Sequence, residues 1–177
     1  NVGCPSKAVQ KGSFGACLMR DKKLVRNCIE SMKNAGNIEV TLKCRIGLGK
    51  NLDYDFFLEF INEIIKSEIK VIYVHARNAI LNGISPKANR TVPILNYDFV
   101  SDIKKEFPNV QFILNGGIDS LEKAKKLSNN FDGVMVGRLI QQNPMCLKNV
   151  DKIFFDIKNN EDFSKKIVLE YFEYIKT

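Results

Sequence analysis

Residues 110–138 read VQFILNGGIDSLEKAKKLSNNFDGVMVGR, and this segment alone indicates the fold class. A nearly continuous apolar run at Val110–Gly117 is followed by a helical pattern near Ser120–Ser128 and a second apolar run at Gly133–Arg138. Such runs are typical of strands in parallel sheets, which need a crossover helix between them. Ser120 stands where a helix N-cap is expected, with Lys123 in place of the acidic capping-box residue. The segment therefore predicts a β/α/β unit.

The same alternation of strands and helices extends upstream. It predicts a helix, a strand, a helix, a strand and a helix at Asp21–Asn34, Ile38–Gly47, Asp53–Ser67, Lys70–Arg77 and Tyr97–Phe107. Asn1–Cys4 reads as the end of one more strand. Parallel β/α units of this kind form either a doubly wound sheet or a (β/α)8 barrel. A barrel is favoured because no G-x-G-x-x-G motif opens the first helix.

The alternation stops near residue 143. Residues 144–177 contain no further strand pattern, and Asp162–Lys176 reads as an amphipathic helix. We therefore predict an α/β region at 1–143 and the start of a helical domain at 144–177.

The positive charge of the chain is regional. A net charge of +7 arises from 27 basic and 20 acidic residues, and residues 1–20, 40–52 and 69–97 contain no acid at all. These segments hold ten of the 27 basic residues. The rest of the chain therefore contains 17 basic residues and all 20 acidic residues. Each segment includes the C-terminal end of a predicted strand, where barrels bind ligands. The pattern suits phosphate or nucleic acid, although acid-free windows also occur by chance in basic proteins.

Several classes of protein are excluded by composition. No apolar run approaches the roughly 18 residues of a membrane helix, so no membrane association is expected. Five cysteines without a C-x-x-C pair, and a single histidine, give no metal-ligand pattern and no disulfide framework. Reduced cysteines in a cytosol-like compartment are expected. The chain begins at Asn1 without a leader, which suggests a piece of a longer protein.

Two strand ends offer groups that bind phosphate. The turn Asn115-Gly116-Gly117 presents backbone N–H groups without a Cβ, and Gly137-Arg138 adds a guanidinium. Phosphate sites of barrels commonly lie after the last two strands. A simple tight turn is the alternative reading of the glycines.

Lys43 lies inside an otherwise apolar strand, where an unpaired ammonium group is costly. Its partner is then an anionic ligand such as a reduced flavin; the alternatives are a carboxylate on a neighbouring strand or a side chain that extends outward to solvent. Strand alternation points Cys44 away from Lys43. His75, the only histidine, is either a satisfied core residue or a donor to a ligand carbonyl or phosphate.

Cys4 precedes Pro5 at a strand end. An ordinary thiol, with a pKa of about 8.5, is mostly protonated at neutral pH and can act as a general acid; a small buried hydrophobe is the alternative. In the loop Ser85–Arg90 (SPKANR), Lys87 and Arg90 have no acid nearby. They suit a phosphate backbone, unless the loop is merely solvated.

In this order, NVGCPS-x3-Q-x-G-x-FGACLM, LKCRIG, VHAR, G-x-SPK-x-NR, LNGGI and DGVMVGR resemble the tRNA-dihydrouridine synthases, most of all their A-type branch. The resemblance runs from Asn1 to about Pro144. It implies an FMN-binding (β/α)8 TIM barrel, present here from the end of strand 4 through strand 8, followed by the start of a helical tRNA-binding domain. It also implies NADPH-dependent reduction of uridine to 5,6-dihydrouridine in the tRNA D-loop. A cytoplasmic location is expected, with an organelle left open.

The resemblance assigns a role to each candidate residue. Cys4 would protonate uridine C5 while FMN N5 delivers hydride to C6 from the opposite face. FMN would be held by Lys43 and His75, with its phosphate side near Asn115, Gly116, Gly117, Gly137 and Arg138. The uridine, which must flip out of its stack to reach a flavin, or the adjacent tRNA backbone would meet Asn1, Lys87 and Arg90.

The chain departs from that family by what it lacks. Roughly the first three strands are missing, with a Pro-Met segment and a glutamine of the flavin site. Activity is therefore expected of the full-length protein, and open barrel edges predict self-association of the fragment. Two readings stay open beside this one. The chain could belong to another FMN barrel that acts on a pyrimidine, of the dihydroorotate dehydrogenase kind, or be an inactive fragment that binds RNA.

Overall fold

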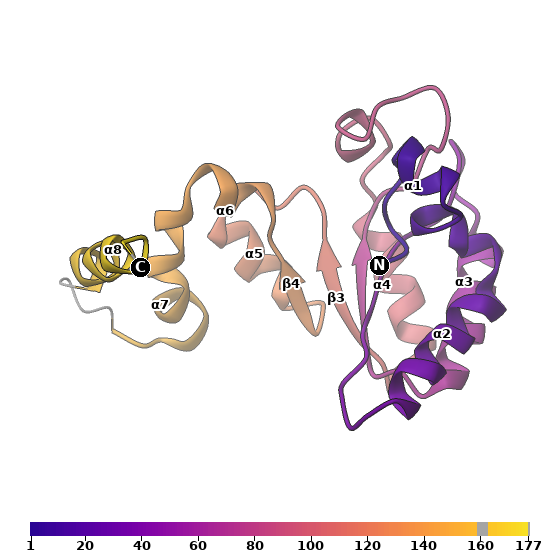
Figure 1. Ribbon diagram of the computed structural model, residues 1–177, viewed down its shortest axis with the longest axis horizontal. Helices are drawn as coiled ribbons and strands as arrows, with labels where there is room; N and C mark the ends of the chain where they lie inside the picture. The colour runs from indigo at the N-terminus through magenta and orange to yellow at the C-terminus, as the bar shows by residue number, and fades with distance from the viewer. Residues whose placement is uncertain (159–162, 177) are drawn as a thin grey trace.

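Four parallel strands lie at the centre of the molecule in the computed structural model, which describes residues 1–158 and 163–176 (Figure 1). The sheet has the order β1-β2-β3-β4, with bounds Leu42–Arg45, Val71–His75, Gln111–Asn115 and Gly133–Met135. This order follows the sequence without reversal, whereas a doubly wound sheet reverses at its switch point. The predicted α/β class with a parallel sheet is confirmed, and the barrel-like winding agrees with the order.

Helices cover one face of this sheet (Figure 1). They are α2, α3, α4 and α5, at Lys22–Asn34, Tyr54–Ile64, Tyr97–Glu106 and Leu121–Ser128. Each begins where the sequence predicted, and Asp21, Asp53, Asn96 and Ser120 cap their N-termini. The predicted cap is confirmed at Ser120, whose hydroxyl accepts a hydrogen bond from the N–H of Lys123 at 3.1 Å.

The main core lies between this helical layer and the sheet. Phe57, Phe60, Ile61 and Ile64 of α3 are fully buried, as their helical spacing predicts. Ile72, Val74, Phe112 and Leu114 meet the helices from β2 and β3 and are also fully buried. The alternate strand residues Lys43, Tyr73 and Ile113 are only half-buried. Among the described residues, the helical layer therefore covers one face of the sheet, and the other face stays partly exposed.

The strands are shorter than predicted. A residue counts as part of a strand only where it pairs with a neighbouring strand. Of the predicted strand Gly133–Arg138, only Gly133–Met135 pairs with β3, and these residues form β4. The end of that run instead leads into a short helix, α6 (Arg138–Gln142). Asn1–Cys4 is not a ladder strand, but the N–H of Val2 donates to the carbonyl of Lys43 at 2.8 Å. The N-terminal residues thus lie alongside β1 as the predicted strand end would.

Short elements that carry no strong periodicity complete the chain. They are α1 (Lys7–Lys11) and α7 (Val150–Phe155) and the 3-10 turns η1 (Gly15–Arg20), η2 (Ile65–Ser67), η3 (Ala88–Arg90) and η4 (Pro144–Asn149). η2 accounts for the end of the predicted helix Asp53–Ser67.

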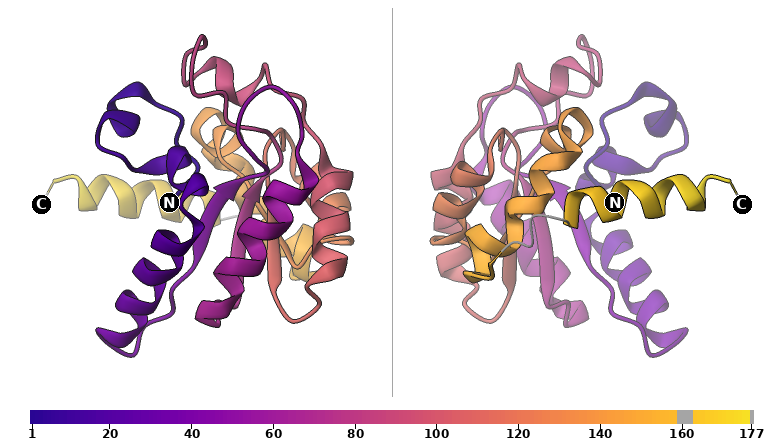
Figure 2. Two further views of the ribbon diagram at one scale, coloured as in Figure 1. Left: turned by 90° about the vertical axis from the view of Figure 1, so that its right-hand side faces the viewer. Right: turned by 90° about the vertical axis from the view of Figure 1, so that its left-hand side faces the viewer.

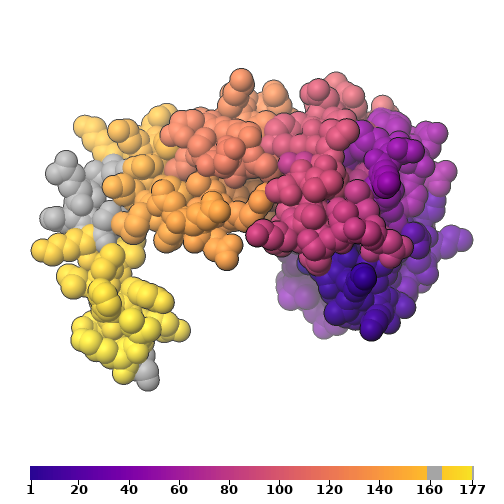
Figure 3. All heavy atoms as spheres, turned by 90° about the horizontal axis from the view of Figure 1, so that it is seen from above, coloured from indigo at the N-terminus to yellow at the C-terminus, as the bar shows by residue number. Residues whose placement is uncertain are grey.

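Helix α8 (Phe163–Tyr174) corresponds to the predicted helix Asp162–Lys176, whose first residue lies outside the described residues. It projects from one end of the molecule (Figure 3). No helix in the described part of the chain is long and apolar enough to cross a membrane.

The buried core predicts an unequal cost for two identical substitutions. Ile72 is fully buried, whereas Ile94 is 78% exposed. Ile72→Ala should lower the free energy of unfolding by about 2–5 kcal/mol, through lost burial and a residual cavity. Ile94→Ala should change it by less than about 0.5 kcal/mol. Urea denaturation monitored by circular dichroism measures both, and equal midpoints would contradict the position of the core.

Candidate active site

The C-terminal ends of the four strands form a single row. The sheet register aligns Arg45 with His75, His75 with Asn115, and Asn115 with Met135. The loops that follow these strands, and the N-terminal segment beside β1, therefore meet at the same end of the sheet (Figure 2). This is the edge at which parallel β/α proteins bind ligands.

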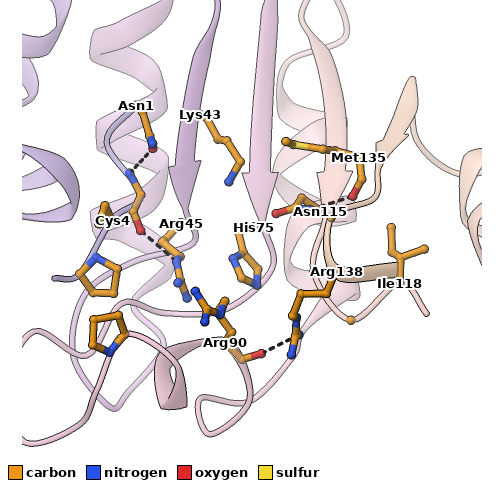
Figure 4. Close-up of a pocket in the computed structure, with 16 residues that line it drawn as sticks. Asn1, Cys4, Lys43, Arg45, His75, Arg90, Asn115, Ile118, Met135 and Arg138 are labelled. Atoms are coloured by element: carbon orange, nitrogen blue, oxygen red, sulfur yellow. Dashed lines mark hydrogen bonds between the residues drawn. The ribbon is translucent and has the colours of Figure 1, made fainter. Parts of the chain in front are cut away.

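A cavity of about 310 Å³ opens at this edge. Its size lies in the usual range of small-molecule sites, about 300–1,000 Å³. Figure 4 shows Lys43 and His75 between Cys4 on one side and Asn115 and Arg138 on the other. The lining brings together ten of the eleven predicted site residues: Asn1, Cys4, Lys43, His75, Arg90, Asn115, Gly116, Gly117, Gly137 and Arg138. Lys87 lines a neighbouring hollow of about 410 Å³, which it shares with Arg90 and Arg138.

The cavity is strongly basic. Lys43, Arg45, Arg90 and Arg138 line it, and none of the described residues in its lining is acidic. These four cations take part in none of the ion pairs that the described residues form. Burial lowers the pKa of Lys43 from its ordinary value. No carboxylate among the described residues pairs with Lys43, whose half-buried side chain lines the cavity and can meet an anionic ligand there.

His75 is a neutral, buried group in this cavity. The residue is 8% exposed, and its Nε2 has no hydrogen-bond partner among the described residues. Burial, then the charges of Arg45 and Lys43, lower the pKa of His75 to about 3. A neutral imidazole can donate or accept a hydrogen bond, so the orphaned Nε2 is available to a ligand polar group.

The glycine turn after β3 is held close to His75. Gly116 has φ +111°, and a Cβ there would lie 2.5 Å from Cδ2 of the imidazole, so only glycine fits. The hydroxyl of Tyr97 donates to the carbonyl of Gly116 at 2.7 Å, and the ammonium of Lys123 donates to that of Gly117 at 2.5 Å. The turn is thus braced from two helices.

Asn115 and Gly137 have different surroundings in the cavity wall. The amide of Asn115 donates to the carbonyl of Met135 at 2.7 Å, which ties the end of β3 to the end of β4. Gly137 also lines the cavity, and no atom lies within 4 Å of the position that a Cβ would take there.

Cys4 is a half-buried free thiol at the cavity wall. Its carbonyl accepts a hydrogen bond from the N–H of Ala16 at 2.8 Å. Cys44 instead lies in the core beneath α3, fully buried, and burial raises its pKa to about 12. The expectation that Cys44 points away from Lys43 is confirmed. Cys4 is the one cysteine among the described lining residues.

Sequence reasoning missed Arg45. This residue is 3% exposed and donates to the carbonyls of Gly3 at 3.2 Å, Asn78 at 3.3 Å and Asn89 at 2.8 Å. Burial, followed by nearby cations, lowers its pKa to about 10, so the guanidinium stays charged at neutral pH. The signal was present, because Arg45 follows Lys43 by two positions and must share its face of the strand.

No cluster of three or more His, Cys, Asp or Glu side chains that could hold a metal ion occurs in the described part of the chain. Fold and cavity together define a parallel β/α protein with a basic cavity at its strand ends.

A family model described as dihydrouridine synthase matches residues 1–176. The chain is 44% identical, over 99% of its length, to the tRNA-dihydrouridine(20/20a) synthase of Escherichia coli strain K12, and covers 51% of that protein. It is 46% identical to the synthase of the same name from Shewanella oneidensis over 86% of the chain and 46% of the relative. The chain therefore belongs to the dihydrouridine synthase family, and the resemblance to the A-type branch is confirmed. It spans about half the length of the curated relatives it matches.

The low pKa of His75 predicts a pH-dependent contribution to stability. Its pKa of about 3 in the folded chain lies below the value of about 6.5 in an unfolded chain. Between these values only the unfolded chain binds the proton, so the contribution is complete above pH 6.5 and is lost as the pH falls toward 3. The loss should reach about 2 kcal/mol between pH 7 and pH 5. It should be absent in His75→Gln.

Two measurements check this. Because His75 is the only histidine, its imidazole proton resonances can be followed by NMR without ambiguity. They should show no titration above about pH 5, and the unfolding free energies of wild type and His75→Gln should diverge on acidification. An imidazole titration near pH 6.5 would contradict the buried, cation-facing position of His75.

Proposed function

We propose that the full-length protein containing this chain reduces uridine to 5,6-dihydrouridine in the D-loop of tRNA, with FMN as cofactor and NADPH as reductant. The observation that carries the proposal is one cavity that joins Cys4, Lys43, His75 and both glycine-containing strand ends. Family membership supports the same reaction. The relatives' printed name refers to positions 20 and 20a, which we propose as the target uridines.

The residues present fit an FMN molecule. Lys43 would lie against the anionic edge of the reduced ring, since its ammonium has no carboxylate partner among the described residues. The unpaired Nε2 of His75 would bind a ring carbonyl or phosphate oxygen. Gly116, Gly117, Gly137 and Arg138 would surround the phosphate side, with Asn115 acting chiefly as a brace between strands. When bound, reduced FMN would supply the hydride that adds to uridine C6.

Cys4 would supply the proton. Addition of hydride to C6 leaves the electron pair of the former C5=C6 bond at C5, where a proton must be added to complete the reduction. An ordinary thiol is mostly protonated at neutral pH and can donate this proton. Cys4 lies across the cavity from Asn115 and Arg138, in keeping with donation from the face opposite the flavin (Figure 4).

The tRNA would approach over the loop that carries Lys87 and Arg90. Both side chains are exposed, and they share a hollow with Arg138 next to the cavity. Phosphate contacts of this kind position a nucleic acid, whereas contacts to the base select it. We propose that Lys87 and Arg90 bind the backbone beside the flipped uridine and that Asn1, at the cavity wall, contacts the base.

The placement of the chain in the whole protein follows from the same proposal. Residues 1–143 would form the barrel from the end of strand 4 through strand 8, and 144–177 would begin a helical tRNA-binding domain. Strands elsewhere in the full-length protein would cover the half-buried inner face of the sheet. In the isolated chain that face and the sheet edges would instead favour self-association. We propose a cytoplasmic location.

Neither alternative is favoured by a specific observation. Another flavin barrel that acts on a free pyrimidine, of the dihydroorotate dehydrogenase kind, would have no need of the cations at Lys87 and Arg90. An inactive RNA-binding fragment would stay colourless after addition of FMN, so the absorption spectrum of the purified protein separates it from the proposal.

Substitution of Cys4 tests the function. In the full-length protein, Cys4→Ala should lower dihydrouridine formation on unmodified tRNA by at least about 100-fold, the scale of a lost general acid. FMN content should be unchanged, because the thiol is not needed to hold the cofactor. Cys28→Ala, at an exposed cysteine outside the cavity, is the control. Nucleoside mass spectrometry measures the product, and normal turnover in Cys4→Ala would remove Cys4 from this role.

Substitution of Arg90 tests the RNA contact. Arg90→Ala should weaken tRNA binding and reduce the slope of log affinity against log salt by about one, since one phosphate contact is lost. Lys87→Ala should behave in the same way. Lys50→Ala, at an exposed cation outside the cavity and the hollow, should leave the slope unchanged. Fluorescence anisotropy at several salt concentrations is sufficient, and equal slopes for all variants would place the tRNA elsewhere.

A further inference from the structure

Two loops that lie far apart in the sequence meet at the cavity, and hydrogen bonds from two side chains connect them. We call residues 1–6, which carry Cys4, the donor loop, and residues 78–93, which carry Lys87 and Arg90, the RNA loop. Gln10 donates through Nε2 to the carbonyl of Pro5 at 2.9 Å and to that of Leu81 at 2.8 Å. Gln10 thus connects the donor loop to the RNA loop with one amide group.

Arg45 makes the second connection. Its Nε donates to the carbonyl of Gly3 in the donor loop at 3.2 Å, and its Nη1 donates to that of Asn89 in the RNA loop at 2.8 Å. Both arginine contacts are buried. The guanidinium has a fixed planar shape, so it fixes the separation of the two carbonyls more tightly than a flexible ammonium would.

The backbone on both sides of the thiol is therefore held from outside the donor loop. Three successive carbonyls, those of Gly3, Cys4 and Pro5, accept hydrogen bonds from Arg45, from the N–H of Ala16 and from Gln10. Each donor comes from a different segment: β1, η1 and α1.

The two residues of the RNA loop that accept these hydrogen bonds, Leu81 and Asn89, are connected within the loop. The side chain of Asn89, which is fully buried, bonds the N–H of Ile80 at 2.8 Å and its carbonyl at 2.9 Å. Leu81, the partner of Gln10, follows Ile80 directly and packs in an apolar cluster with Ala16 and Ala79. Donor loop and RNA loop consequently form one braced unit.

We propose that Gln10 and Arg45 are positioning residues, which hold the Cys4 thiol in register with the uridine that the RNA loop presents. The inference rests on the proposed function of the cavity. Gln10 does not line the cavity and both of its contacts are to loop carbonyls, so it acts on the reaction only through the position of Cys4 relative to the RNA loop. A displacement of about 1 Å at a reacting group can cost about 100-fold in rate.

Gln10→Met in the full-length protein is the test, since methionine keeps the side-chain shape without the donors. We expect oxidation of the reduced enzyme by tRNA, measured in a single turnover, to slow at least tenfold. Reduction by NADPH and the affinity for tRNA should stay within twofold of wild type. Lys11→Met, at the exposed neighbouring residue of α1, should change none of these values. Equal losses in both half-reactions, or no loss, would overturn the proposal.

A double-mutant cycle tests whether Gln10 acts through the thiol. With Cys4→Ala already present, adding Gln10→Met should slow oxidation no further, because the group that it positions is gone. Additive losses would assign Gln10 another role.

Alkylation of Cys4 by iodoacetamide, followed on the Cys4 peptide by mass spectrometry, needs no turnover. Gln10→Met should change its rate at least threefold and Lys11→Met should not; an unchanged rate in Gln10→Met would overturn the proposal. A wild-type protein that forms no dihydrouridine would refute the proposed function, while this readout would still decide whether Gln10 positions Cys4.

Discussion

The site depends on one geometric constraint, which is that parallel strands in sequential order end on the same edge of their sheet. The register places Arg45, His75 and Asn115 side by side at that edge, although some 30 to 40 residues separate each from the next in the chain. The ends of all four strands and the loops after β2, β3 and β4 then contribute to a common cavity. The helices on the other face supply the burial that keeps the row fixed, so core packing and site geometry have the same origin.

Two arginines at this edge of the sheet donate hydrogen bonds to backbone carbonyls instead of forming ion pairs with carboxylates of the described residues. Arg45 is satisfied by backbone carbonyls, and Arg77 likewise donates to the carbonyls of Thr91 and Pro93. Carbonyl acceptors satisfy the hydrogen-bonding groups of a guanidinium without cancelling its charge. The cations therefore brace the loops and at the same time leave a positive field in the cavity, which adds to burial in lowering the pKa of His75. An anionic ligand would relieve their mutual repulsion, and its binding would stabilise the folded protein.

Much of this could be predicted from periodicity and from the residues at strand ends. The strands and main helices follow apolar patterns that burial enforces, and Lys43, His75 and the Asn115–Gly117 turn were identifiable because they interrupt those patterns. Strand lengths were overestimated, since pairing depends on a neighbour that the local sequence does not specify. Arg45 was overlooked although strand alternation placed it beside Lys43. Gln10 could not have been assigned, because its partner Leu81 is 71 residues away and is bound through a backbone carbonyl that any residue supplies.

The central claim is that uncompensated cations at the strand ends form the site of an anionic flavin. Titration of the flavin-free, full-length protein with FMN and with riboflavin, which lacks the phosphate, tests this claim most directly. The account predicts that FMN binds at least about tenfold more tightly, as one charge-assisted phosphate contact would provide, and that added salt narrows the difference. Equal affinities that do not respond to salt would contradict it.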